Sequence, residues 1–74
     1  MRKVEDNYFL KQFGQNLKTV RISKGFTQEH LADCLNVEIS QISRIERGVN
    51  CTSIINLKKI ADSLKVDVGE LFNF

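Results

Sequence analysis

The sequence has no proline, only four glycines and only two cysteines, Cys34 and Cys51, among its 74 residues. It therefore carries few of the residues that interrupt helices. Two cysteines are too few for a disulfide framework, so we expect both to be free thiols in a reducing compartment. A chain this short forms one small domain, residues 1–74, and such domains often gain stability by associating with a second copy.

Long apolar runs are also absent. No stretch approaches the roughly 20 apolar residues of a membrane-spanning helix, so we expect no membrane contact. The first ten residues, MRKVEDNYFL, lack the continuous apolar segment of a secretory signal, which predicts a cytoplasmic protein. The formal net charge is only +2, with 11 lysines and arginines against 9 aspartates and glutamates. This balance permits a polyanionic partner but does not require one.

Apolar residues recur at spacings of three and four, and no alternation typical of strands persists. The sequence therefore predicts an all-α domain, a compact bundle of five short helices. For the first helix, Asp6 or Asn7 is a suitable N-cap, and Gly25 marks the end. Its apolar face is formed by Phe13, Leu17 and Val20.

The second helix is predicted over QEHLADCL, with Thr27 as its N-cap. Asn36 follows it and tolerates the left-handed conformation that a tight turn needs. A third helix is expected from about residue 38 to residue 47, stopping at Gly48. The residues expected to be buried in these two helices are Leu31, Ala32, Leu35, Ile42 and Ile45.

The fourth helix is predicted over IINLKKIADSLK, with Ser53 as its N-cap. Its apolar stripe comprises Ile54, Leu57, Ile60, Ala61 and Leu64. Asp67 is a suitable cap for a last short helix that reaches Leu71 and Phe72.

The segment TQEHLADCLNVEISQISRIERG, residues 27–48, resembles the helix-turn-helix of the lambda-repressor-like, or Cro-type, family of bacterial and phage regulators. TQEHLA is similar to the opening of that family's second helix, and ISRIERG to the end of its recognition helix. LKTVRISKGFTQ and SIINLKKIADSLKVDVGELF also match family positions, so the resemblance covers roughly residues 9 to 72. It implies a sequence-specific DNA-binding transcriptional regulator, with the helix-turn-helix at about 27–47, that inserts its third helix into the major groove.

By this resemblance, the side chains that contact bases come from the third helix. They are Glu38, Ile39, Ser40, Gln41, Ser43 and Arg44. Arg44 can pair with the O6 and N7 atoms of guanine, whereas a serine contacts several bases with less selectivity. Ile39 either contacts a thymine methyl group or is partly tucked into the core. Glu38 either accepts from a cytosine or, as we prefer, favours the helix dipole.

The resemblance also implies a set of contacts to the DNA backbone. Its members are Lys24, Thr27, Gln28, Arg47, Asn50, Thr52 and Ser53. Gln28 occupies a position that touches the backbone in the family or supports the recognition helix. Arg21 and Glu46 fall where the family forms an arginine–glutamate pair between the first and third helices, and we interpret this ion pair as structural.

The segment VDVGELFNF, about residues 66–74, is rich in apolar residues. It either closes the core or forms the interface of a homodimer, for which the predicted residues are Leu71, Phe72 and Phe74. A two-fold dimer would present two recognition helices about 34 Å apart, which suits a pseudo-palindromic operator in double-stranded DNA.

Enzymatic function is not expected. The one histidine, His30, lies four residues before Cys34, and this spacing is half a metal site or half a thiol–imidazole pair with no evident further ligand. We therefore predict no catalytic residue, metal or cofactor, and no small-molecule effector is evident. A protein-interaction module, such as an antitoxin or adaptor, is the alternative, but the Ser, Gln and Arg face of the third helix favours DNA. Within DNA binding, the chain looks like a phage-type repressor or the controller protein of a restriction–modification system.

Overall fold

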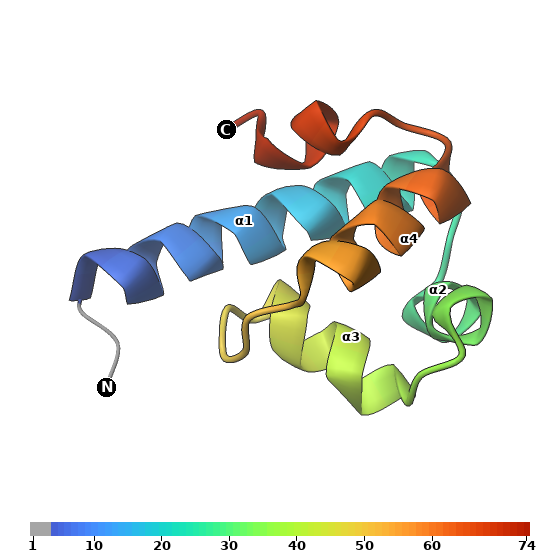
Figure 1. The fold of residues 1–74 in the computed structure, drawn as a ribbon, viewed down its shortest axis with the longest axis horizontal. Helices are drawn as coiled ribbons and strands as arrows, with labels where there is room; N and C mark the ends of the chain where they lie inside the picture. The colour runs from blue at the N-terminus through green and yellow to red at the C-terminus, as the bar shows by residue number, and fades with distance from the viewer. Residues whose placement is uncertain (1–3) are drawn as a thin grey trace.

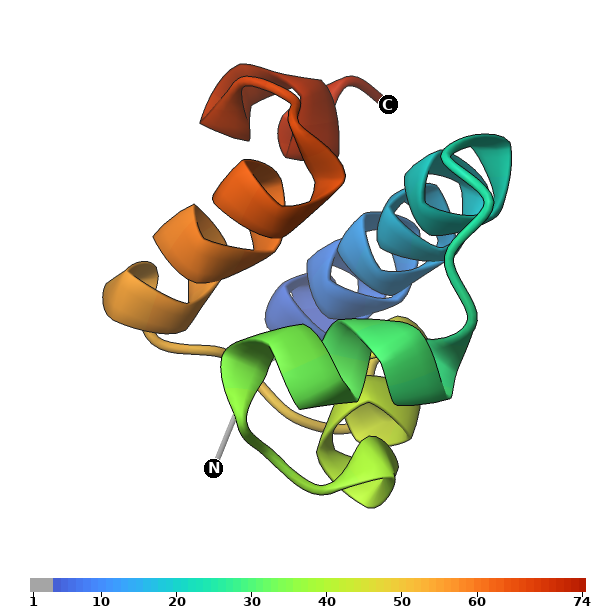
Figure 2. The same cartoon turned by 90° about the vertical axis from the view of Figure 1, so that its right-hand side faces the viewer.

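The computed structural model describes residues 4–74, and these residues form helices and turns without any strand. The elements are α1 (Val4–Ser23), α2 (Gln28–Leu35), α3 (Ile39–Glu46), α4 (Ile54–Leu64) and a 3-10 helix, η1 (Val68–Phe72). Figure 1 shows α1 as a long rod with α3 on one side and the C-terminal segment on the other. In Figure 2, α2 lies across α3, and α1 and α4 rise on either side of this pair.

The all-α prediction is confirmed, but the five short helices are wrong in two respects. The first helix has 20 residues and begins before Asp6 and Asn7, so these two residues lie inside it and do not cap its start. The last helix is a 3-10 helix of 5 residues, and Asp67 makes no side-chain capping bond to it. The expected lack of a secretory signal concerns the first ten residues, of which residues 1–3 lie outside the described residues.

The helix ends around the predicted turn follow local capping chemistry. Thr27 Oγ1 accepts a hydrogen bond from the His30 backbone N–H at 3.0 Å, and Asn36 closes α2 in the left-handed region with φ 58°. Ser53 Oγ accepts from the Asn56 N–H at 3.1 Å and so begins α4. At α3, Glu38 is the N-cap residue and makes no side-chain capping bond, so the helix itself begins one residue later than predicted.

One hydrophobic core joins all five elements. Its buried members are Phe13, Leu17, Leu31, Ala32, Leu35, Ile42, Ile45, Ile60, Ala61, Leu64 and Leu71. Ile54 was expected in the α4 stripe and is instead 82% exposed; it is the first residue of its helix. Leu71 is fully buried, so this predicted dimer residue belongs to the core of the protomer and is not available to a second copy.

Close contact between α1 and the end of α3 fixes how these two helices cross. A Cβ atom at Gly14 would collide with the backbone oxygens of Ile45 and Glu46. Gly48 has φ +75°, and a Cβ there would lie 2.7 Å from the Cα of Lys11. Only glycine permits this approach of the two backbones, which places one face of α1 directly beside the C-terminal end of α3.

Candidate nucleic-acid interface

The outer face of α3 is polar and exposed. Ile42 and Ile45 anchor the helix in the core and are 0% and 4% exposed. The predicted base-contacting residues lie around the rest of its circumference, where Glu38, Ile39, Ser40, Gln41 and Arg44 are exposed and Ser43 is half-buried. Ile39 is 46% exposed, so part of its surface is available to a ligand while the rest is covered by the protein.

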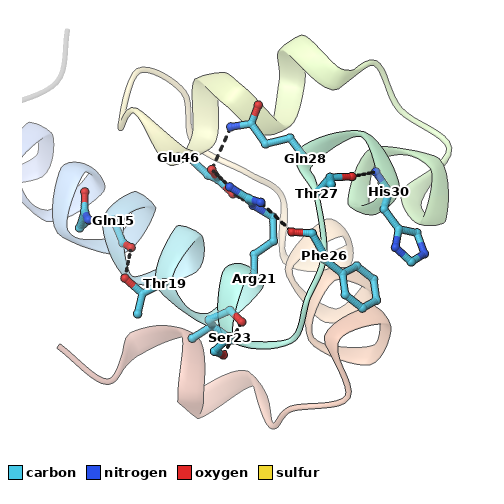
Figure 3. A network of polar contacts seen from close by, with 10 residues as sticks. Gln15, Thr19, Arg21, Ser23, Phe26, Thr27, Gln28, His30 and Glu46 are labelled. Carbon is cyan, nitrogen blue, oxygen red and sulfur yellow. Dashed lines mark hydrogen bonds and ion pairs between the residues drawn. The ribbon is translucent and has the colours of Figure 1, made fainter.

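A buried polar network holds α3 against the two preceding helices (Figure 3). Arg21 Nε donates to Glu46 Oε2 at 2.6 Å, and Arg21 Nη2 donates to Glu46 Oε1 at 3.1 Å. A third donor, Arg21 Nη1, reaches the carbonyl oxygen of Phe26 at 2.7 Å. The structure thus brings together the arginine and the glutamate of the predicted structural pair, whose side chains are only 8% and 2% exposed.

Gln28, the first residue of α2, joins the same network. Its Nε2 donates to Glu46 Oε1 at 2.9 Å, so the glutamate is held from α1 and from α2 at once. This contact matches the supporting role that was one of the two expectations for Gln28. Because every donor to the carboxylate comes from a different element than α3, the network sets the orientation of the recognition helix relative to α1 and α2.

The predicted backbone-contacting residues are only partly brought together. Arg47 and Asn50 are exposed in the segment that follows α3, and Thr27 is exposed just before α2. Thr52 Oγ1 is buried, so this hydroxyl is not available to a phosphate. Lys24 lines a cavity of about 570 Å³ with Lys65 of the α4–η1 turn and Glu70 of η1, and none of the α3 residues lines it.

Sequence reasoning missed three polar residues of α1. Lys11, Gln15 and Lys18 line a cavity of about 330 Å³ together with Gln28, Glu46 and Arg47. Their spacing of four and three residues puts them on one helical face, a signal that the sequence contains. The sequence alone does not tell that this face adjoins the end of α3, because that depends on the glycine contacts between the two helices.

The histidine and the cysteines form no site of their own. The His30 ring stacks on Phe26 with ring centroids 4.2 Å apart, and Cys34 and Cys51 are exposed free thiols. Within residues 4–74, no group of three or more His, Cys, Asp or Glu side chains is placed to hold a metal ion. None of the helices in this part of the chain is long and apolar enough to cross a membrane.

Comparisons with known proteins agree on one family. The sequence profile of the helix-turn-helix family matches residues 17–71. The control protein C.BamHI of Bacillus amyloliquefaciens is 38% identical over 63 residues, which are 84% of this chain and 78% of that protein. The uncharacterized HTH-type transcriptional regulator YazB of Bacillus subtilis is 34% identical over 80% of this chain and 86% of its own length.

A solved structure extends this likeness to the fold. The restriction-modification controller protein C.AhdI from Aeromonas hydrophila superposes with a TM-score of 0.85 and 36% sequence identity. The match covers 89% of this chain and 96% of that one.

Proposed function

Since the chain belongs to the helix-turn-helix family and is a DNA-binding transcriptional regulator, we propose that it inserts α3 into the major groove of a pseudo-palindromic operator as a homodimer. The observation that supports this proposal most strongly is that α3 is held firmly in the core on one face and is polar on its outer face. Ile42, Ile45 and the Arg21–Glu46 pair fix α3 from inside, while its serines, glutamine and Arg44 face outward.

We assign base recognition mainly to Arg44, Ser40 and Gln41. Arg44 is exposed in the last turn of α3 and carries the bidentate donor geometry that suits guanine O6 and N7. Ile39, exposed at the helix start, suits a thymine methyl group. Glu38 precedes the first turn, where its charge favours the helix dipole, so we assign it to the helix and not to a base.

Contacts to the DNA backbone are proposed on both sides of α3. At the N-terminus of α2, Thr27 and Gln28 adjoin backbone N–H groups that favour an anion. Arg47 and Asn50 flank the other end of the recognition helix and are exposed. These contacts would orient the protein on the duplex, whereas the side chains of α3 would supply the preference for particular bases.

The proposed dimer surface is aromatic. Phe72 and Phe74 are 40% and 50% exposed and contact Phe9 of α1, with ring centroids 6.3 Å and 5.6 Å apart. Exposed aromatic rings gathered on one face are typical of interfaces, and a two-fold axis would pair this face with itself. A second copy would add buried apolar area to a core that is small.

Within the family, we propose a controller role in the cytoplasm. It rests on the likeness to the control protein C.BamHI and to the restriction-modification controller protein C.AhdI. The relatives are regulators of transcription, and we propose no enzymatic activity for this chain. An antitoxin or adaptor role is less well supported, because the outer face of α3 offers charged and polar groups where a protein partner would meet apolar ones.

The test is selection of bound duplexes from a random DNA pool with the purified protein. We expect a two-fold-symmetric site to emerge, and Arg44→Ala to relax the preference at one base pair in each half-site by about 1–3 kcal/mol. Arg47→Ala is the matched control, since loss of a phosphate contact weakens all sequences alike. Weak binding without base preference would refute the regulator mechanism, and a monomer on the selected duplex would refute the dimer.

A further inference from the structure

We propose that the cavity between α1 and the end of α3 binds a phosphate of the DNA backbone, which makes α1 part of the DNA-binding surface. This α1 cavity is lined by Lys11, Gln15, Lys18, Gln28, Glu46 and Arg47 and has a volume of about 330 Å³. The inference rests on the proposed function and adds to it a contact from a helix outside the helix-turn-helix.

The cations converge because of how α1 and α3 meet. Lys11 and Lys18 lie seven residues apart on one face of α1, which is two helical turns. A Cβ atom built on Gly48 would lie 2.7 Å from the Cα and Cγ atoms of Lys11, so α1 at Lys11 lies close to the residue that follows Arg47. Three cationic side chains, two from α1 and one from the residue that follows α3, therefore border one cavity.

The charge of the cavity is positive in spite of its one carboxylate. Glu46 Oε1 and Oε2 accept hydrogen bonds from Arg21 and Gln28, and the glutamate side chain is only 2% exposed. Its charge is thus compensated from inside the protein. The side chains of Lys11, Lys18 and Arg47, by contrast, are exposed and make no ion pair within residues 4–74. An anion is the complementary ligand for such a rim.

The position of the cavity favours DNA over a free anion. Gln28 forms part of its wall and is the first residue of α2, directly after Thr27. Arg47 also lines the cavity and directly follows the recognition helix. The cavity therefore adjoins two of the positions assigned to the DNA backbone, so a strand that passes the N-terminus of α2 can place a phosphate at the cationic rim that Lys11, Lys18 and Arg47 form.

The experiment measures affinity for the selected duplex as a function of salt concentration. Each phosphate contact contributes about 0.9 to the slope of log K against log salt. Lys18→Gln should therefore reduce the magnitude of this slope by about 0.9 for each protomer bound. It should weaken binding to all duplexes by the same factor and leave the base preference unchanged. Lys11→Gln should act in the same direction.

Lys59→Gln is the matched control, because Lys59 lies on α4 outside the cavity. Lys58 is less suitable, since the Asp62 carboxylate accepts its hydrogen bond at 2.8 Å and raises the pKa of Lys58 above its ordinary value. Thermal unfolding of each variant without DNA tests the structural alternative, in which Lys11 only stabilises the C-terminal end of α3. That alternative predicts a lower Tm with an unchanged slope.

The outcomes separate this inference from the proposed function. A wild-type protein that selects no site contradicts the proposed function itself. A selected site whose salt slope is the same for wild type and Lys18→Gln overturns only the α1 cavity. If inorganic phosphate raises the Tm of the wild type but not of Lys18→Gln while the slope stays unchanged, the cavity is a free-anion site and the assignment to DNA is wrong.

Discussion

The strongest prediction concerns the buried pair that holds the recognition helix. Arg21→Met removes the guanidinium and keeps an unbranched apolar side chain in the place of the arginine's aliphatic stem. Among the described residues, Glu46 is then left with Gln28 as its one remaining side-chain hydrogen-bond donor, and its side chain is 2% exposed. Removing one partner of a buried ion pair costs about 3–5 kcal/mol, because the remaining charge is uncompensated away from water.

This loss is large in relation to the whole domain. At about 0.05–0.15 kcal/mol per residue, a chain of this length has a free energy of unfolding of about 4–11 kcal/mol. For a domain of this size each kcal/mol lowers the Tm by about 4–8 °C, so we expect a decrease of at least about 12 °C. The carbonyl of Phe26 also loses its donor, which adds to the loss.

Urea unfolding at a fixed protein concentration measures the effect, with the concentration held constant because association adds to stability. Arg47→Met is the control, since Arg47 is exposed and its side chain makes no ion pair with the described residues. The double variant Arg21→Met/Glu46→Leu should recover much of the loss, because no buried charge remains. The reasoning is refuted if the single variant loses less than about 1 kcal/mol, or if the double variant is no more stable than it.

Three further predictions test local features by the same unfolding measurement. Gly14→Ala should destabilise by about 1–3 kcal/mol, because its Cβ meets the α3 backbone, whereas Gly69→Ala, with nothing within 4 Å, should change little; equal effects would contradict the close helix contact. Lys65→Gly should stabilise by a few tenths to about 1 kcal/mol, since Lys65 has φ 57°, and a loss of stability would argue against it. Ser53→Ala should cost about 1 kcal/mol by removing the α4 cap, and an unchanged midpoint would show that the cap is dispensable.

Much of the helix-turn-helix could be predicted from the sequence because its signals are local. The N-caps Thr27 and Ser53 and the left-handed Asn36 each act within a few residues, and all three were found where expected. The burial of Ile42 and Ile45 follows from helical spacing, which is also local. The family resemblance supplied the pairing of Arg21 with Glu46, 25 residues apart, which spacing alone does not give.

In the candidate site, too, local spacing predicted some residues, whereas the positions of others depend on packing. The helical spacing that buries the isoleucines also turns Ser40, Gln41 and Arg44 outward, so the sequence predicted their exposure. Lys24 looked equivalent to the other basic residues in sequence, yet it lies beside the α4–η1 turn. Which basic residues gather beside α3 depends on how the elements pack, and no local pattern encodes this.

The sequence by itself determined the all-α class, the position of α2 and the turn after it, and the inward face of α3, because helix periodicity and capping act over a few neighbouring residues. Only the tertiary structure decided which faces meet. It buried Leu71, left Ile54 exposed and brought Lys11 and Lys18 to Arg47. The physical reason is that burial and the gathering of charge depend on the crossing of helices distant in sequence, here set by backbone contacts at two glycines.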